Sequence, residues 1–424
     1  MHRHWILVTV AALLIGVAVP AAAQFELHGF MEAAGGVRLQ QVGPPPASWG
    51  SPGVLPPVWS GGQDYTLREA RLQLKSDFYG SNAEAHFVAD ILADQVAGDG
   101  TGIILREGWT KFNAFGDHLE ARVGRQPTTW GTGDLIFIND LFPKDYVSFF
   151  IGREDQYLKG PSDAVRLGWF GLPLAVDLVY TPIFAPNILP TGERLVFWTP
   201  AYAPVQDPQQ KIENGETALR LSRAIGSTTL AFYGYWGFWK NPSGFSPADT
   251  SVAGSMPYYY YPQLNVYGVS ARGSLMGGVA WVEGGWYDSH DDRDGTNPLI
   301  ANSEGRAMAG YERQWWSDFT GGLQFYWEGV QDYQPGEYVK DENYTLVTLR
   351  LMQMLRYQTV KLSAFGYYSP SEADSYVRLA AGYDYTDELN LTVGANLFQG
   401  DNEQTLFGMN EDNSNAYLRV RYSF

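Results

Sequence analysis

Apolar and polar residues alternate strictly at positions 416–424 of the chain. Successive side chains of a β-strand point to opposite faces, so this period of two predicts a strand. Its apolar face consists of Ala416, Leu418, Val420, Tyr422 and Phe424, and its polar face of Tyr417, Arg419, Arg421 and Ser423. An edge strand of a soluble sheet would alternate in the same way, so the pattern alone does not identify the surroundings of the strand.

Alternating segments of about ten residues recur from residue 24 onward, and Gly, Asp, Asn and Pro separate them. We expect short turns near residues 79–82, 115–117, 171–173, 225–227, 276–277, 316–318, 357–358 and 387–388. We expect long connections near residues 42–63, 95–101, 128–163, 183–213, 240–259, 288–303, 332–342, 369–374 and 400–412. Because short and long connections alternate, the sequence predicts an all-β fold: one antiparallel, up-and-down barrel of about eighteen strands over residues 24–424.

The strand at residues 416–424 resembles the closing strand of bacterial outer-membrane β-barrels, which typically ends in Phe. The resemblance implies a transmembrane barrel in the outer membrane of a Gram-negative bacterium, with its apolar face toward lipid. The implied partners are outer-membrane lipid and lipopolysaccharide, together with the barrel-insertion machinery that would read Phe424. Residues 1–23 agree with export, because Arg3 precedes an apolar run and a small-residue site, and they predict a secretory signal peptide that is removed.

The composition is compatible with such a barrel. The 424 residues include no Cys, so neither disulfides nor thiolate metal sites are expected. Aromatic residues make up 15% of the chain, with 27 Tyr and 14 Trp, which suits aromatic girdles at two membrane interfaces. The net charge of −17 argues against nucleic acid as a partner.

Charged residues share one face of the predicted strands. A charge facing lipid costs ~2–4 kcal/mol near the middle of a membrane, so this face is expected to line the lumen. The predicted pore-lining residues are Arg71, Lys75, Arg122, Arg166, Arg220, Arg272, Glu283, Arg350, Arg378, Arg419 and Arg421. They could form a wall that orients polar or anionic solutes or a network of ion pairs that only neutralises the wall. Alternation is weak at residues 105–115, and the facing of that strand stays open.

The third long connection, residues 128–163, is too long to serve only as a link between strands. We expect this extracellular loop to fold into the lumen and narrow it, although a lid on the outer surface is an alternative. Its charged residues would then set the charge at a constriction: Asp134, Asp140, Lys144, Asp145 and Arg153.

A short pattern leads into this loop. It runs from Leu105-Arg106-Glu107-Gly108-Trp109 through Gly124-Arg125-Gln126 to Trp130-Gly131. The pattern is similar to one in proteobacterial porin-like families that include the alginate-export type. The resemblance covers only this part of the chain distinctly, and it implies an eighteen-stranded barrel with an inward-folded loop. The resemblance does not indicate which substrate passes through the barrel, because the matching residues are Gly, Trp and Arg that serve the scaffold.

Other candidate chemistry is sparse. No nucleophile lies beside a base in a recognisable motif, so we do not expect an enzyme. The acidic residues Asp288, Asp291, Asp292 and Asp294 could hold Ca²⁺, but their spacing departs from an EF-hand, and solvated loop acids are the simpler interpretation. No other cofactor is expected. Aromatic and apolar residues at 42–61, 183–205 and 258–261 could stack on sugar rings, bind a hydrophobic solute or simply pack the loops together.

The sequence as a whole predicts a porin, a channel for passive diffusion of small hydrophilic solutes, anionic or saccharide ones among them. An uptake channel for hydrophobic compounds is one alternative. A non-conducting barrel that binds surfaces or sheathes a partner is another. Ion conductance across a planar bilayer separates the first interpretation from the last, and the oligomeric state stays open.

Overall fold

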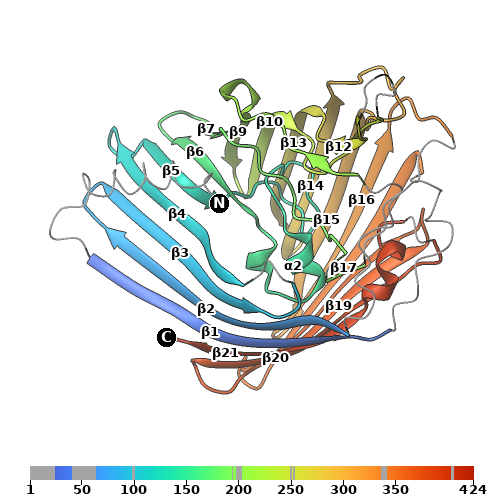
Figure 1. The fold of residues 1–424 in the computed structure, drawn as a ribbon. Helices are drawn as coiled ribbons and strands as arrows, with labels where there is room; N and C mark the ends of the chain where they lie inside the picture. The colour runs from blue at the N-terminus through green and yellow to red at the C-terminus, as the bar shows by residue number, and fades with distance from the viewer. Residues whose placement is uncertain are drawn as a thin grey trace.

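The computed structural model describes residues 24–40, 64–97, 101–192, 194–196, 203–248, 251, 254–335, 341–402 and 405–424. The predicted signal peptide, residues 1–23, lies outside them. Eighteen strands form one continuous sheet, and each strand pairs with its neighbours in an antiparallel manner (Figure 1). The sheet closes into a barrel because β21 pairs with β1 as well as with β20.

Short turns and long connections alternate between the strands of the barrel, as the sequence predicts. They are β1 Gln24–Arg38, β2 Tyr65–Tyr79, β3 Ala83–Asp94, β4 Gly102–Ala114, β5 Leu119–Pro127, β6 Pro161–Trp169, β7 Ala175–Thr181, β9 Glu216–Ile225, β10 Thr228–Phe238, β13 Gln263–Leu275, β14 Gly278–Ser289, β15 Glu304–Trp316, β16 Phe319–Val330, β17 Asn343–Leu355, β18 Val360–Ser369, β19 Asp374–Asp384, β20 Leu389–Gln399 and β21 Asn415–Ser423. The predicted barrel of about eighteen strands is confirmed.

Smaller elements lie between these strands. A three-stranded sheet lies at the loop end of the barrel, the end that carries the long connections; the opposite end, with the short turns, is the turn end. This sheet contains β8 Val205–Gln206, β11 Gly244–Ser246 and β12 Tyr258–Tyr260. The helix α2 spans Tyr146–Phe150, and the 3₁₀ helices are η3 Asp155–Tyr157, η4 Ile212–Asn214 and η5 Gly408–Asn413. Among the described residues, no helix has the length and apolar character that crossing a membrane would require.

The two faces of the barrel differ as the alternation predicts. In β21, Leu418 and Val420 are exposed on the outer face, whereas Tyr417 is buried on the inner face. Arg421 also points inward, where it donates hydrogen bonds to Glu32 of the neighbouring β1. The inner and outer faces of the strand at residues 416–424 are therefore as predicted.

A β-bulge explains the weak alternation at residues 105–115. Between β3 and β4, Val88 pairs with Glu107 whereas Ala89 pairs with Leu105, which leaves Arg106 as an extra residue. A bulge adds one residue to one strand and re-aims the side chains on either side of it. The period of two is therefore interrupted at Arg106.

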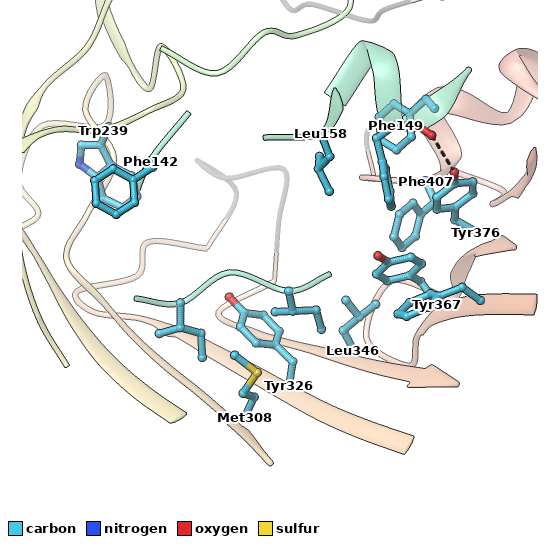
Figure 2. Packing of buried hydrophobic residues seen from close by; sticks show 14 of the residues in the cluster. Phe142, Phe149, Leu158, Trp239, Met308, Tyr326, Leu346, Tyr367, Tyr376 and Phe407 are labelled. Atoms are coloured by element: carbon cyan, nitrogen blue, oxygen red, sulfur yellow. Dashed lines mark hydrogen bonds between the residues drawn. The ribbon is translucent and has the colours of Figure 1, made fainter. Parts of the chain in front are cut away.

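The connection between β5 and β6 runs inside the barrel, and α2 lies within the ring of strands (Figure 1). Asp145 caps α2 by accepting a hydrogen bond of 2.8 Å from the Ser148 amide. Phe149 of this helix packs against Tyr376 on β19, with ring centroids 5.7 Å apart (Figure 2). Phe150 also packs against Tyr376, at 5.5 Å. The hydrophobic core of this barrel consequently lies in its interior, between the connection and the wall.

Candidate functional site

The inner segment, defined here as residues 128–160, is held to the wall by polar contacts at several points around the ring. Near its start, the Glu283 carboxylate on β14 accepts hydrogen bonds from the Thr132 amide at 2.6 Å and the Asn139 amide at 2.8 Å. Asp134 accepts two bonds from Arg350 on β17, at 2.9 and 2.8 Å. These contacts dock the first half of the inner segment on β14 and β17.

The second half docks on β2 through a buried group of charges that we call the Glu69 network. Its members are Glu69, Arg71, Asp90, Asp94, Arg153 and Arg194. Glu69 of β2 accepts hydrogen bonds from Arg153 of the inner segment and, at 3.2 Å, from Arg194 of a later connection. Its side chain is 3% exposed, and burial in low dielectric strengthens each of these bonds. The network therefore ties β2, β3, the inner segment and the later connection together.

Glu154, directly before η3, and Asp155, its first residue, extend this docking to the last strands of the barrel. Glu154 lies 2.6 Å from Arg421 on β21, and Asp155 accepts a hydrogen bond of 2.9 Å from Arg378 on β19. Arg419 is also close, with its guanidinium 3.9 Å from Glu154. Arg378, Arg419 and Arg421 therefore lie on the inner face, as predicted, but they contact the inner segment rather than an open passage.

The middle of the inner segment contains an internal ion pair. The Lys144 ammonium lies 2.9 Å from Asp140, and both side chains are almost fully buried. Desolvation lowers the pKa of Lys144, although Asp140 opposes this shift by favouring the charged ammonium. Asp140 also accepts a bond of 2.6 Å from the Thr129 hydroxyl, which satisfies its second oxygen.

These contacts change the interpretation of five predicted constriction residues. Asp140 and Lys144 neutralise each other, Asp145 caps α2, and Arg153 belongs to the Glu69 network. Asp134 keeps 26% of its side chain accessible, beside Arg350 at 41%. Burial removes the charges of Asp140 and Lys144 from the surface of a constriction, which the sequence could not show, because an i,i+4 Asp–Lys pair reads the same whether it is solvated or buried. A role of Asp134, Asp145 and Arg153 in setting the charge of a constriction stays a prediction.

The predicted pore-lining residues divide into two groups. All lie on the inner face, but Arg71 and Glu283 are covered by the inner segment and buried at 5% and 4% exposure. In contrast, residues toward the turn end of the barrel remain accessible. Lys75 is 44% exposed, Arg166 is 30% exposed and Arg122 is 22% exposed in their side chains.

Arg220 and Arg272 differ from the other inner arginines. Within the described part of the chain, neither has a carboxylate within ion-pair distance, whereas Arg166 forms a two-pronged pair with Asp177 at 2.8 and 2.6 Å. Asp177 lies opposite Arg220 in the sheet but is already bound to Arg166. Arg272 is exposed, and it donates only a long bond of 3.4 Å to the Thr132 carbonyl. Arg166 is therefore neutralised by an ion pair, whereas a role of Arg220 and Arg272 in orienting anionic solutes stays a prediction.

Sequence reasoning missed two residues that shape this site. Arg106, at the bulge, donates to the Gln156 carbonyl at 3.1 Å and covers the Tyr157 ring at 4.3 Å. Arg194, the other, lies in the 183–205 segment, which was interpreted through its apolar residues alone. The signals were present, since the alternation breaks at Arg106, and Arg194 is a cation directly before an apolar run.

The acidic loop after β14 is organised by its own hydrogen bonds. Asp288 holds Arg293 at 3.0 and 2.9 Å, and Asp292 accepts from the amides of Thr296 and Asn297. In the described parts of the chain, no group of three or more His, Cys, Asp or Glu side chains is arranged to hold a metal ion. The suggested Ca²⁺ site at Asp288, Asp291, Asp292 and Asp294 stays a prediction, with two of its carboxylates engaged elsewhere.

The aromatic connections are only partly packed together. Phe184 contacts Tyr261 and Phe238, with ring centroids 4.7 and 5.6 Å apart. Residues 42–61 lie outside the described residues. Tyr258 and Tyr260 instead border a pocket at the loop end.

No family model and no curated protein sequence matches the chain. Among solved structures, two mutants of a Rh. blastica porin are 13% identical to it, with a TM-score of 0.44. A triple mutant of the Rhodopseudomonas blastica porin is also 13% identical, with a TM-score of 0.43. Each alignment covers 95% of this chain and 100% of the porin. At this identity and TM-score, the likeness provides no evidence beyond the strand pairing described above. Membership of the alginate-export-type family stays a prediction.

Proposed function

We propose that this chain is an outer-membrane channel through which small hydrophilic solutes diffuse. The closed barrel leaves no sheet edge with unpaired backbone groups, which is what a β-structure needs to cross a lipid bilayer. Its outer face presents apolar side chains such as Val269, Leu323 and Phe325, each about half exposed. In a membrane these side chains would contact lipid without the cost that a charge there would carry.

The observation that carries the proposal is the exposure of charged groups on the inner face. Lys361, Arg350 and Arg166 keep 52%, 41% and 30% of their side chains accessible although they point into the barrel. Ionised groups that are accessible and only partly paired need water around them. The turn-side part of the lumen is therefore expected to be water-filled.

The uncompensated arginines favour anionic solutes over cationic ones. Among the described residues, neither Arg220 nor Arg272 has a carboxylate within ion-pair distance. A positive patch inside a narrow, low-dielectric wall raises the local concentration of anions.

An uptake channel for hydrophobic compounds has less support. The apolar side chains in the interior are packed on one another, as where Tyr376 stacks on Phe398 with ring centroids 4.3 Å apart. Such a cluster stabilises the inner segment and offers its apolar surface to the protein itself. Whether the barrel conducts at all distinguishes the proposal from a non-conducting surface-binding or sheath barrel.

Planar-bilayer recordings under a salt gradient test the proposal. We expect stepwise conductance and a reversal potential of the sign that anion preference gives. The double substitution Arg220→Gln and Arg272→Gln should shift the reversal potential toward cations, and more so at low salt, since the Debye length is only ~8 Å at 0.15 M. The control Arg293→Gln removes one charge from an exposed loop pair and should shift it far less.

The recordings also define failure. Correctly folded barrels that give no conductance steps would overturn the channel and support a non-conducting role. Conductance with unchanged selectivity in the double variant would retain the channel but remove anion preference.

A further inference from the structure

A pocket of about 560 Å³ lies at the loop end of the barrel, away from the inner segment. It lies between the three-stranded sheet, the ends of β10 and β13, and the acidic loop after β14. Its volume falls within the ~300–1,000 Å³ typical of small-molecule sites. The channel proposed above does not use it.

The three-stranded sheet sets the aromatic side of the pocket. β12 pairs antiparallel with β11 and parallel with β8, and this register places Tyr258, Tyr260 and Gln206 on one face. Tyr259 lies on the opposite face, where its ring contacts Phe245 at 5.0 Å. The Tyr258 and Tyr260 rings, 6.3 Å apart and inclined by 60°, offer two half-buried aromatic surfaces.

Backbone hydrogen bonds hold this sheet in place. The Phe245 amide donates to Leu299 at 2.8 Å, and the Tyr259 amide donates to Pro204 at 2.9 Å. The Trp239 amide, just after β10, donates to Pro262 at 3.0 Å. The sheet is therefore tied to two neighbouring connections, and a ligand would meet a largely pre-formed surface, which lowers the entropic cost of binding.

Polar groups in the pocket are available for a ligand. Within the described residues, the side chains of Gln206, Asp207 and Gln263 make no hydrogen bond, and all three are exposed. Asp291 accepts one bond of 2.9 Å from the Gln263 amide. Burial, with Asp291 as the next contribution, raises the pKa of Tyr260, so its phenol stays protonated and can donate a hydrogen bond. The pocket lining contains no Lys, Arg or His.

We propose that this pocket binds a neutral saccharide at the mouth of the barrel. The faces of aromatic rings accept the apolar faces of sugar rings, while carboxylate and amide side chains pair with hydroxyl groups. Gln206, Asp207, Gln263 and Asp291 supply both donors and acceptors around the two tyrosines. Asp207 and Asp291 disfavour a uronate, because like charges brought together are repulsive.

An organic cation is the main competing ligand, because tyrosine rings and carboxylates also suit quaternary ammonium groups. The amides of Gln206 and Gln263 favour the sugar, since a quaternary ammonium offers them no hydrogen-bonding group. The two classes respond differently to charge removal. Asp207→Asn keeps hydrogen bonding to a hydroxyl but removes one of the two negative charges that would attract a cation.

Binding to the folded barrel in detergent tests the proposal without reference to conductance. The probes are maltotetraose, cellotetraose, tetragalacturonate and choline, measured by saturation-transfer NMR and calorimetry. We expect at least one neutral tetrasaccharide to bind, tetragalacturonate to bind about tenfold more weakly or not at all, and Tyr260→Ala to reduce affinity by about tenfold or more. Tyr259→Ala is the matched control, because it truncates the neighbouring ring on the opposite face.

Gln206→Ala provides a second variant that leaves the aromatic residues of the sheet intact, and it should also weaken the neutral sugar. Absence of binding by both neutral probes at millimolar concentration would overturn the proposal. So would choline binding that Asp207→Asn abolishes while sugars do not bind, or sugar binding that Tyr260→Ala leaves unchanged. A barrel that binds the sugar but does not conduct would overturn the channel and retain this site.

Discussion

At the scale of single residues, the sequence predicts which face of a strand a charged side chain occupies, but it does not predict the ion-pair partner of that side chain. Period-two alternation was enough to place Arg71 and Glu283 on the inner face. It could not show that Arg71 pairs with Glu69 and Asp90 beneath the inner segment, because such pairing depends on distant parts of the chain. Glu69 is the residue most dependent on that tertiary context, since three arginines converge on it.

Removing the charge of Glu69 should therefore destabilise the barrel strongly. Glu69→Gln leaves Arg71, Arg153 and Arg194 without their shared negative charge, and breaking a buried ion pair typically costs ~3–5 kcal/mol. Equilibrium unfolding in detergent or lipid measures this free energy. Protease cleavage within the inner segment should also become faster, because Arg153 anchors it.

Glu120→Gln is the control for this prediction. It removes the same charge from the inner face of β5, but the side chains of Glu120 and its neighbour Arg122 are 29% and 22% exposed and 3.4 Å apart. Pairs that water reaches contribute ~0–1 kcal/mol. Equal losses in the two variants would contradict the assignment of Glu69 as the anchor.

At the scale of elements, the strands and turns were predictable and the inner segment was not. Strand boundaries follow from local alternation and turn residues, and both are visible in the sequence. The path of residues 128–160 depends on contacts with β2, β14, β17, β19 and β21, which no local pattern reveals. The bulge at Arg106 lies between these cases, because the alternation showed an irregularity without showing its geometry.

Gly152 should be critical for seating the inner segment. Its φ of +80° lies in the left-handed region, and a Cβ there would stand 2.2 Å from Cε1 of Tyr417 on β21. Gly152→Ala should displace the segment from the wall, because neither the backbone nor the ring can relax cheaply. We expect faster proteolysis within residues 128–160 and noisier single-channel current.

Gly116→Ala separates backbone strain from the clash. Gly116 has a similar φ of +65°, but nothing lies within 4 Å of its Cβ position in the turn after β4. It should cost only the ~1–2 kcal/mol of a left-handed alanine. If both variants show the same proteolysis and the same current, close packing on Tyr417 does not seat the segment.

At the scale of the whole molecule, the barrel depends on the seam between its first and last strands. β1 pairs with β2 over most of its length and with β21 over its second half. The sequence predicted Phe424 as an address for the insertion machinery, and nothing in the alternation indicated a further role. The structure adds one, since Phe424 contacts the first strand directly.

Deleting Phe424 should weaken closure even without any cellular machinery. Its amide donates to the Gly29 carbonyl and its carbonyl accepts from the Gly29 amide, each at 3.0 Å. Losing both bonds should cost ~1–3 kcal/mol. Refolding purified protein into detergent, followed by heat-modifiable migration, measures the folded fraction, and Tyr385→Ala is the control because it truncates an exposed aromatic at a turn. Phe424→Ala retains the backbone bonds, so it should refold better than the deletion in vitro. Both variants should be depleted in cells if the ring is also the assembly signal.

A deletion variant that refolds normally in vitro yet is scarce in cells would contradict the role in closure. Phe424 would then serve recognition alone, and the remaining β1–β21 hydrogen bonds would be enough to close the barrel.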